Sequence, residues 1–238
     1  MLIIKNLEAG YGKVQVLHGI SIHIPKGQVV TLIGSNGAGK TTTMRAVSGM
    51  IKPTAGEISL NGKRVDGMES YTIAKLGLAH SPEGRRVFST MSVTDNLLLG
   101  AFPRLTGSRP KGDVAGDLER AMDLFPRLKE RRTQLAGTLS GGEQQMLAMA
   151  RILRTGASLL LLDEITEGLA PVIVQTLRQL MGQLKQRGFT IILVEQNFHF
   201  AADLADRHYV IDRGTIAEMI TREQLPASTE KLNHYLGV

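Results

Sequence analysis

One stretch near the N-terminus has the residue types and the spacing of a phosphate-binding loop. Residues 34–42 read G-S-N-G-A-G-K-T-T, which matches the pattern G-x-x-x-x-G-K-[ST]. Glycines let the backbone curl with its N–H groups toward an anion, and a following helix N-terminus adds partial positive charge. Lys40 can reach the β- and γ-phosphates of a nucleotide, and the Thr41 hydroxyl can bind Mg²⁺. The stretch predicts nucleotide binding but leaves the nucleotide and the reaction open.

Two adjacent acids follow an unbroken leucine run later in the chain. Residues 159–162 show no apolar–polar alternation, which is typical of a strand buried on both faces of a parallel sheet. Asp163 and Glu164 follow at its carboxyl end, the edge where open α/β sheets bind ligands. Beside a phosphate loop, Asp163 is the candidate for holding Mg²⁺ and Glu164 the candidate for deprotonating a water. The alternative is a pair of acids placed at a helix start by the helix dipole.

A third stretch, L-S-G-G-E at residues 139–143, precedes an amphipathic helix expected over 144–154. Ser140 and Glu143 have the spacing of a capping box. The two intervening glycines leave N–H groups uncovered at the helix start, which predicts a second anion site. Helix capping alone is the simpler alternative.

The elements that must position these residues follow from hydrophobic patterning. An apolar strand over 28–33 leads into the phosphate loop, and a helix is expected to continue from it over 42–47. Tyr11 lies in a G-Y-G turn, where an exposed ring could stack on a base or could be an ordinary turn residue. Short strands are expected at 2–4, 14–17, 20–24, 57–60, 76–80 and 189–194, with a hairpin over 209–218. The first three strands predict a small antiparallel sheet, and residues 88–155 a helical lobe inserted into the α/β core.

Composition narrows the class of protein. The chain has 238 residues and no cysteine, so disulfides, thiolate metal sites and cysteine nucleophiles are excluded. The N-terminus lacks a signal-peptide layout and no apolar run is long enough to span a bilayer, so a membrane role is expected through a partner. The net charge is +6, but the arginine clusters at 85–86, 127–132 and 151–154 are separated, and aromatic residues make up only 4%. These values favour a solvated basic surface over a nucleic-acid interface.

The phosphate loop, the L-S-G-G-E stretch and the leucine strand ending in Asp-Glu occur in an order that resembles the ATP-binding subunit of ABC transporters, over nearly the whole chain. Three further stretches resemble the branched-chain amino acid importers, in their LivF-type subunit. They are P-E-G-R-R-V-F at 82–88, T-E-G-L-A-P at 166–171 and V-E-Q-N at 194–197. Urea and amide importers are similar at these places and remain the alternative.

The resemblance implies a P-loop ATPase cassette of the α/β class, with a mixed central sheet, a small antiparallel subdomain and the helical lobe, in one domain over 1–238. It implies ATP and Mg²⁺ as ligands. It also implies head-to-tail dimers, homo- or heteromeric, with two ATP between the subunits and each phosphate loop facing the partner's L-S-G-G-E signature. The other implied partners are integral-membrane permease subunits and, indirectly, a solute-binding protein, with no nucleic acid. The implied location is the cytoplasmic face of the inner membrane, with coupling through the Glu83 loop and the helical lobe.

The resemblance also assigns roles to individual residues. The implied catalytic residues are Glu164, Lys40 and Gln196. The implied Mg²⁺ ligands are Thr41, Asp163 and Glu83. The implied nucleotide contacts are Tyr11, Val16, Gly34, Ser35, Asn36, Gly37, Ala38, Gly39, Lys40, Thr41, Thr42, Ser140, Gly141 and Gly142, the last three across the dimer interface.

The chain departs from the general ABC pattern at four of its positions. Glu83 stands where most members have Gln, and Ala170 where most have Asp. Gln196 replaces the usual switch His; its amide can hydrogen-bond a γ-phosphate but cannot take up a proton as imidazole does. Ile165 replaces the usual Pro and is expected to loosen the turn that aims Glu164, which would slow hydrolysis.

Two other function classes compete with a transport ATPase. Soluble ABC-type ATPases of DNA repair or translation resemble two cassettes in tandem or a cassette split by a long coiled coil, and this chain has one cassette and no such heptad run. A P-loop kinase or GTPase would leave residues 139–143 and Tyr11 unexplained. The cargo of a transporter is not written in this chain, because the ATP-binding subunit does not contact it.

Overall fold

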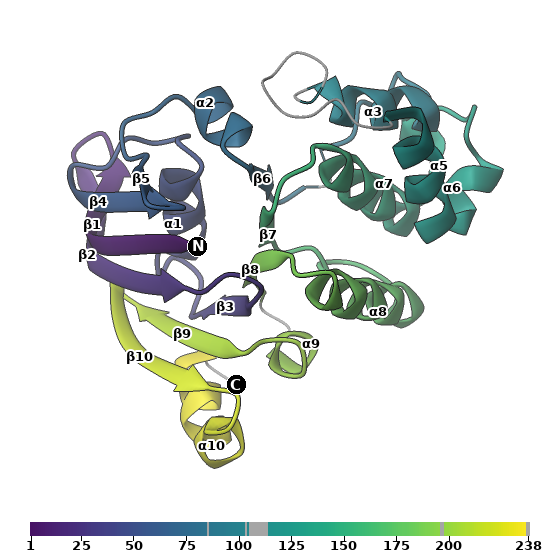
Figure 1. The fold of residues 1–238 in the computed structure, drawn as a ribbon. Helices are drawn as coiled ribbons and strands as arrows, with labels where there is room; N and C mark the ends of the chain where they lie inside the picture. The colour runs from purple at the N-terminus through teal and green to yellow at the C-terminus, as the bar shows by residue number, and fades with distance from the viewer. Residues whose placement is uncertain (85, 103, 105–113, 196–197, 237–238) are drawn as a thin grey trace.

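Two β-sheets organise the computed structural model, which describes residues 1–84, 86–102, 104, 114–195 and 198–236 (Figure 1). In this part of the chain, the smaller sheet is antiparallel with strand order β2-β1-β4-β5. The larger sheet has the order β10-β9-β3-β8-β7-β6 and is parallel except for β10, which pairs antiparallel with β9. The strands are β1 (Leu2–Tyr11), β2 (Val14–Ile24), β3 (Val29–Ile33), β4 (Ala55–Leu60), β5 (Lys63–Arg64), β6 (Leu78–Ser81), β7 (Leu159–Asp163), β8 (Thr190–Val194), β9 (Arg207–Asp212) and β10 (Thr215–Thr221). The predicted α/β class with a mixed central sheet and a small antiparallel sheet is confirmed.

Helices pack around the central sheet, and α3, α5 and α6 gather beside α7 on one side of the molecule (Figure 1). The helices are α1 (Lys40–Val47), α2 (Ser70–Lys75), α3 (Val93–Gly100), α5 (Val114–Leu124), α6 (Pro126–Glu130), α7 (Gly141–Arg154), α8 (Pro171–Gln186), α9 (Phe198–Ala202) and α10 (Leu225–Leu236), with a 3₁₀ turn, η1, at Ala136–Thr138. Residues 105–113, within the helical lobe expected over 88–155, lie outside the described part of the chain. None of the described helices is both long enough and apolar enough to cross a bilayer.

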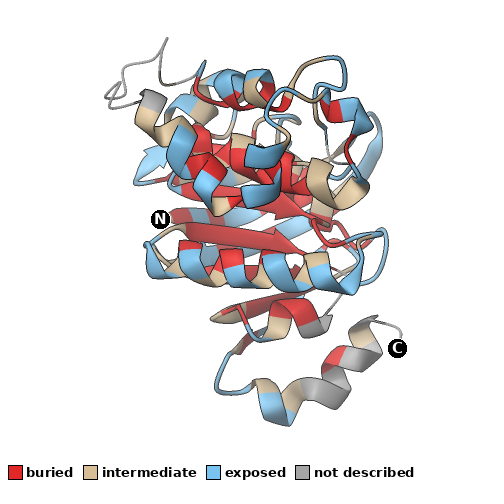
Figure 2. Cartoon of the chain, turned by 90° about the vertical axis from the view of Figure 1, so that its right-hand side faces the viewer, coloured by how far each residue is buried: buried red, intermediate tan, exposed pale blue. Residues whose placement is uncertain are grey.

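The leucine run forms β7, in the middle of the molecule, where both faces of the sheet are covered. Leu159 and Leu161 pack into the core that includes α1 and the antiparallel sheet, whereas Leu160 and Leu162 pack into the core that includes α7 and α8. All four side chains are fully buried. In Figure 2, the buried strands of the sheet run behind helices whose outward faces are exposed. The continuous apolar pattern therefore predicted the strand correctly, because neither face meets water.

The antiparallel sheet differs from expectation in the extent of its strands and in its membership. The first strand, expected at 2–4, continues to Tyr11, and β4 and β5, which follow the phosphate loop, also belong to the sheet. Residues 14–17 and 20–24 were expected to be separate strands, yet they form the single strand β2. Gly19 has φ +81°, and the pairing shifts register there, with Leu7 opposite Ile20 and Glu8 opposite His18. The extra residue is a β-bulge, which bends a strand without ending it. Gly19 indicated an irregularity at this point of the sequence. It did not indicate that the pairing of β2 with β1 resumes beyond it.

Candidate active site

The phosphate loop joins the carboxyl end of β3 to the start of α1. Gly39 is the N-cap of α1 and has φ +113°, a backbone conformation that L side chains rarely adopt. A Cβ atom there would also lie 2.7 Å from Leu17 Cδ2, so the loop packs tightly against β2. The helix consequently begins at Lys40, directly below the loop.

Lys40 is folded back onto its own loop. Its Nζ donates hydrogen bonds to the carbonyl oxygens of Gly34, at 2.7 Å, and Ser35, at 2.9 Å. Burial lowers the pKa of Lys40, while the nearby carboxylates of Glu164 and Asp163 oppose that shift. The buried Lys40 ammonium thus contacts the loop and lies near the two acids predicted to work with it.

Asp163 ends β7 as a buried carboxylate beside the first turn of α1. Burial raises the pKa of Asp163 to about 6; the Thr41 hydroxyl opposes the rise, and Glu164 and Glu83 add to it. Both carboxylate oxygens are buried and make no hydrogen bond of normal geometry with the described residues. Buried carboxylate oxygens next to a hydroxyl are the hard oxygen donors that Mg²⁺ prefers, so this donor set fits the ion.

Glu164 continues directly from β7 into a turn with an unusual backbone conformation. It has φ +49°, uncommon for a residue other than glycine. Its carboxylate lies with those of Glu83 and Glu167, with one oxygen of each within 4.8 Å of the others. Glu83 reaches the group because it follows β6, the neighbour of β7. Glu167 was not predicted as a site residue, although it lies in the T-E-G-L-A-P stretch at 166–171.

A cavity of 560 Å³ collects most of the residues predicted to contact a nucleotide. Its lining residues are Tyr11, Val16, Asn36, Gly37, Gly39, Lys40, Thr41, Thr42, Glu83, Glu164 and Glu167. Gly34, Ser35 and Ala38 belong to the same loop but do not line the cavity. The volume is in the range of small-molecule and cofactor sites.

Tyr11 stands at one end of this cavity with 43% of its surface exposed. Arg45, on α1, donates from Nη1 to the Tyr11 hydroxyl at 3.1 Å, and its guanidinium carbon lies 6.0 Å from the ring centroid. The ring is therefore held by α1 yet remains accessible. The contribution of Arg45 was missed, since no local pattern links Tyr11, the last residue of β1, to a helix residue 34 positions later.

The turn between β9 and β10 supports the phosphate loop from behind. The Gly214 amide donates to the Ala38 carbonyl at 2.9 Å, and its own carbonyl accepts from the His18 amide at 2.8 Å. A Cβ atom at Gly214 would lie 1.9 Å from the Val16 carbonyl oxygen, so only glycine fits this approach. The hairpin was predicted, but its contact with the phosphate loop and β2 was not.

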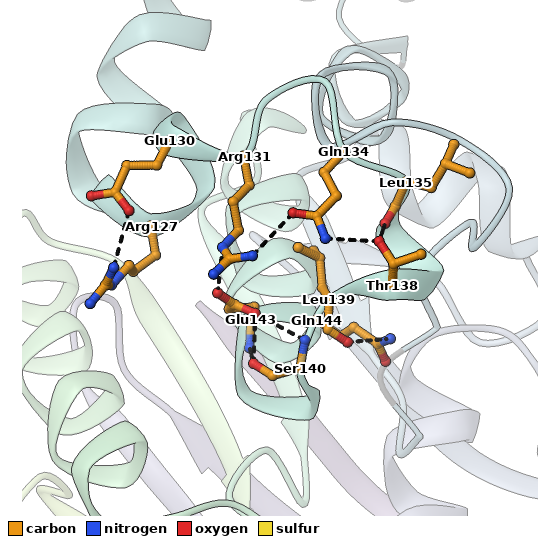
Figure 3. Close-up of polar contacts among 10 residues, drawn as sticks. All are labelled: Arg127, Glu130, Arg131, Gln134, Leu135, Thr138, Leu139, Ser140, Glu143 and Gln144. Carbon is orange, nitrogen blue, oxygen red and sulfur yellow. Dashed lines mark hydrogen bonds and ion pairs between the residues drawn. The ribbon is translucent and has the colours of Figure 1, made fainter.

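The L-S-G-G-E stretch forms the capping box that its spacing predicted (Figure 3). The Ser140 amide and hydroxyl both donate to Glu143 Oε2, at 2.9 and 2.7 Å, and the Glu143 amide donates back to Ser140 Oγ at 3.4 Å. Arg131 Nε lies 2.9 Å from the other Glu143 oxygen. Burial alone would raise the pKa of Glu143, but these Ser140 bonds, with Arg131 and Arg127, lower it overall. Ser140, Gly141 and Gly142 do not line the cavity around Lys40.

Two further predictions concern the residues after β8 and the turn around Glu164. Gln196 lies outside the described residues. Ile165 is 1% exposed and packs into the core with α7 and α8, which anchors the turn at the position where loosening was expected.

A glycine-rich loop between β3 and α1, with a buried acid at the end of β7 beside Thr41, defines a P-loop nucleotide-binding protein. The family model described as ABC transporter matches residues 17–167. The chain belongs to this family, as an ATPase subunit.

Sequence relatives show to which branch of the ABC transporter family the chain is similar. The chain is 44% identical over 237 residues, covering 100% of both chains, to the high-affinity branched-chain amino acid transport ATP-binding protein BraG of Pseudomonas aeruginosa. It is 35% identical over 229 residues, 94% of both chains, to the probable branched-chain amino acid transport ATP-binding protein LivF of Archaeoglobus fulgidus. It is 30% identical over 249 residues to LivG of Escherichia coli, covering 100% of this chain and 98% of that one. The resemblance to the branched-chain amino acid importers is confirmed.

Solved structures confirm the fold. An ATP-binding cassette of an ABC transporter in its ADP conformation superposes with a TM-score of 0.84 at 24% identity, over 100% of this chain and 99% of that one. A second structure, an ATP-binding subunit of an ABC transporter, gives a TM-score of 0.86 at 24% identity over 100% of both chains. The predicted cassette fold is therefore correct.

Proposed function

We propose that this chain is the ATP-hydrolysing subunit of an importer for branched-chain amino acids. The observation that carries the proposal is the single cavity in which the phosphate loop, Glu83 and Glu164 meet, with Asp163 buried beside Thr41. The choice of cargo follows the printed names of the relatives, which are branched-chain amino acid transport ATP-binding proteins.

The phosphate loop provides the binding step. Lys40 exchanges its bonds to the Gly34 and Ser35 carbonyls for bonds to the β- and γ-phosphates, and the loop amides cradle the same oxygens. Tyr11 stacks on the adenine and Val16 packs beside it, since both line the same cavity. The other loop residues between Asn36 and Thr42 bind the triphosphate through backbone contacts.

The acids at the ends of β6 and β7 provide the chemistry. Thr41 and Asp163, with Glu83, would hold Mg²⁺, which neutralises charge on the phosphates when bound. Glu164 orients the attacking water and takes its proton, because its carboxylate opens into the cavity. Gln196, which follows β8 by two residues, donates to the γ-phosphate.

The second half of the site comes from another subunit. Ser140, Gly141 and Gly142 begin α7 outside the Lys40 cavity, and a head-to-tail dimer would bring the partner's copy of them to the γ-phosphate. The dimer is bound to integral-membrane permease subunits at the cytoplasmic face of the membrane, and through them to a solute-binding protein.

Phosphate release by the purified chain tests the proposed activity. We expect hydrolysis of Mg-ATP that a Lys40→Met variant lacks, with GTP competing poorly. Equal phosphate release in the parent and the variant would refute an ATP hydrolase. Hydrolysis of labelled ATP that excess GTP suppresses as strongly as excess unlabelled ATP does would refute specificity for ATP.

The ion pair between Arg131 and Glu143 gives a testable prediction for the signature. Arg131 neutralises a carboxylate that holds both the amide and the hydroxyl of Ser140 (Figure 3). Arg131→Met should leave that charge facing the incoming phosphate and weaken ATP-driven dimerisation by roughly 3- to 10-fold. Analytical ultracentrifugation with ATP measures the strength of dimerisation, and Arg64→Met, whose exposed pair with Glu57 is at 3.3 Å, is the matched control.

An apolar groove offers a docking site for the permease subunits. A hollow of 470 Å³ between β6 and α3 is lined by exposed apolar side chains, among them Met50, Phe88, Leu99 and Phe102. Arg151 lies over the Phe88 ring, with its guanidinium carbon 5.0 Å from the centroid. Contiguous exposed apolar surface of this kind marks interaction sites.

Leu99→Glu is expected to reduce co-purification with the permease subunits roughly tenfold or more, because a charge would be buried at the centre of the contact. ATP binding to the isolated chain should persist, which nucleotide titration checks. Met219→Glu, on β10, alters an exposed apolar residue away from the groove and should co-purify as the parent does. Equal losses in both variants would exclude the groove as the docking site.

A further inference from the structure

Glu195 is a buried carboxylate that joins two strand ends. It follows β8, and its side chain is 4% exposed. Its Oε2 accepts from the Thr166 hydroxyl at 2.6 Å, and its Oε1 accepts from the Thr166 amide at 3.1 Å. The backbone of Ile165 also favours the charged form of this carboxylate. These bonds tie the end of β8 to the turn that follows β7, across 29 positions of sequence.

That turn contains Glu164, whose φ of +49° requires support from its surroundings. On one side, the Glu164 amide donates to the Val194 carbonyl at 2.9 Å. On the other, Thr166 is held by Glu195, and the Ile165 side chain is buried in the core. The backbone is therefore anchored to the end of β8 at Glu164 itself and again at Thr166, and the backbone of Glu164 sets the direction of its carboxylate.

We propose that Glu195 is a positioning residue for ATP hydrolysis, clamping the turn after β7 so that the Glu164 carboxylate points into the cavity. The inference rests on the proposed function, since it assigns a second residue to the action of Glu164. Glu195 does not line the cavity, so its effect passes through Thr166 and the turn.

The clamp depends on hydrogen-bond geometry and not on charge. Burial raises the pKa of Glu195 to about 7, the Thr166 bonds oppose the rise, and the Glu164 carboxylate adds to it. A neutral side chain of the same shape should therefore serve nearly as well. Glutamine keeps one oxygen to accept from the Thr166 amide and offers an N–H₂ that can donate to the Thr166 hydroxyl.

The experiment compares Glu195→Ala, Glu195→Gln and Thr166→Val with the parent, measuring kcat, KM and the Kd for ATP. We expect Glu195→Ala and Thr166→Val to lower kcat about 10- to 100-fold with KM and Kd within about threefold of the parent, as for other misaligned supports of a catalytic group. Glu195→Gln should stay within about threefold of the parent kcat. Hydrogen exchange over residues 164–169 should be faster in Glu195→Ala.

Thr190→Val is the matched control. Thr190 is fully buried at the opposite end of β8, and its hydroxyl accepts from the Gly27 amide at 2.9 Å. Thr190→Val should lower Tm about as much as Thr166→Val does, but it should keep the parental kcat. If the two variants lose kcat equally, the Thr166 contact is merely structural and the inference fails.

The outcomes separate this inference from the proposed function. A Glu195→Ala variant with parental kcat or parental exchange at 164–169, beside an inactive Glu164→Gln, would overturn the clamp alone. A parent chain that hydrolyses no ATP would overturn the proposed function and the clamp with it.

Discussion

Glu164→Gln is expected to lower steady-state ATP hydrolysis by about 10³-fold while ATP still binds, because the amide orients a water but cannot take its proton. The substitution is nearly isosteric and leaves Lys40, Thr41 and Asp163 unchanged. ATP should therefore still close the dimer, and the dimer should persist because hydrolysis no longer opens it. Phosphate release and size-exclusion chromatography with ATP measure the two effects.

Glu167→Gln is the matched control, since Glu167 lines the same cavity and its carboxylate lies beside that of Glu164. Glu167 does not follow Asp163 directly, and we expect its loss to reduce kcat by less than about tenfold. A larger loss in Glu167→Gln than in Glu164→Gln would transfer the role of base from one acid to the other.

Mixing two inactive variants is expected to restore hydrolysis if each site is built from two chains. Lys40→Met disables the phosphate loop, and Ser140→Arg disables the signature by placing a bulky cation where the γ-phosphate would lie. In a mixed dimer both defects fall in one site, so the other site keeps an intact loop and an intact signature. With random pairing and independent sites, the mixture should reach roughly a quarter of the parental rate.

Each variant mixed with itself is the control and should remain inactive. Ser140 is the N-cap of α7, so Ser140→Arg costs about 1 kcal/mol of helix stability, and Tm must show that the variant is folded. A folded pair of variants that forms mixed dimers without regaining activity would exclude a site shared between subunits in this way.

The sequence determined those parts of the site whose geometry is local. The phosphate loop could be predicted because strand, glycine turn and helix are consecutive, and Gly39 needs a φ that side chains disfavour. The strand before Asp163 could be predicted because burial on both faces removes all alternation. The Ser140 capping box could be predicted because its partners lie within one helical turn. The family followed from the order of these motifs.

Tertiary structure alone decided which residues meet across the sheet. Glu195 reaches Thr166, and Gly214 braces Ala38, because the order β9-β3-β8-β7-β6 places the ends of distant strands at one edge. Glu167 joins Glu83 for the same reason. The hydrophobic pattern of the sequence indicates whether a residue is buried. The order of strands in a parallel sheet depends instead on how the crossover helices pack. The strand order is a property of the whole chain, and it determines which residues lie beside Glu164.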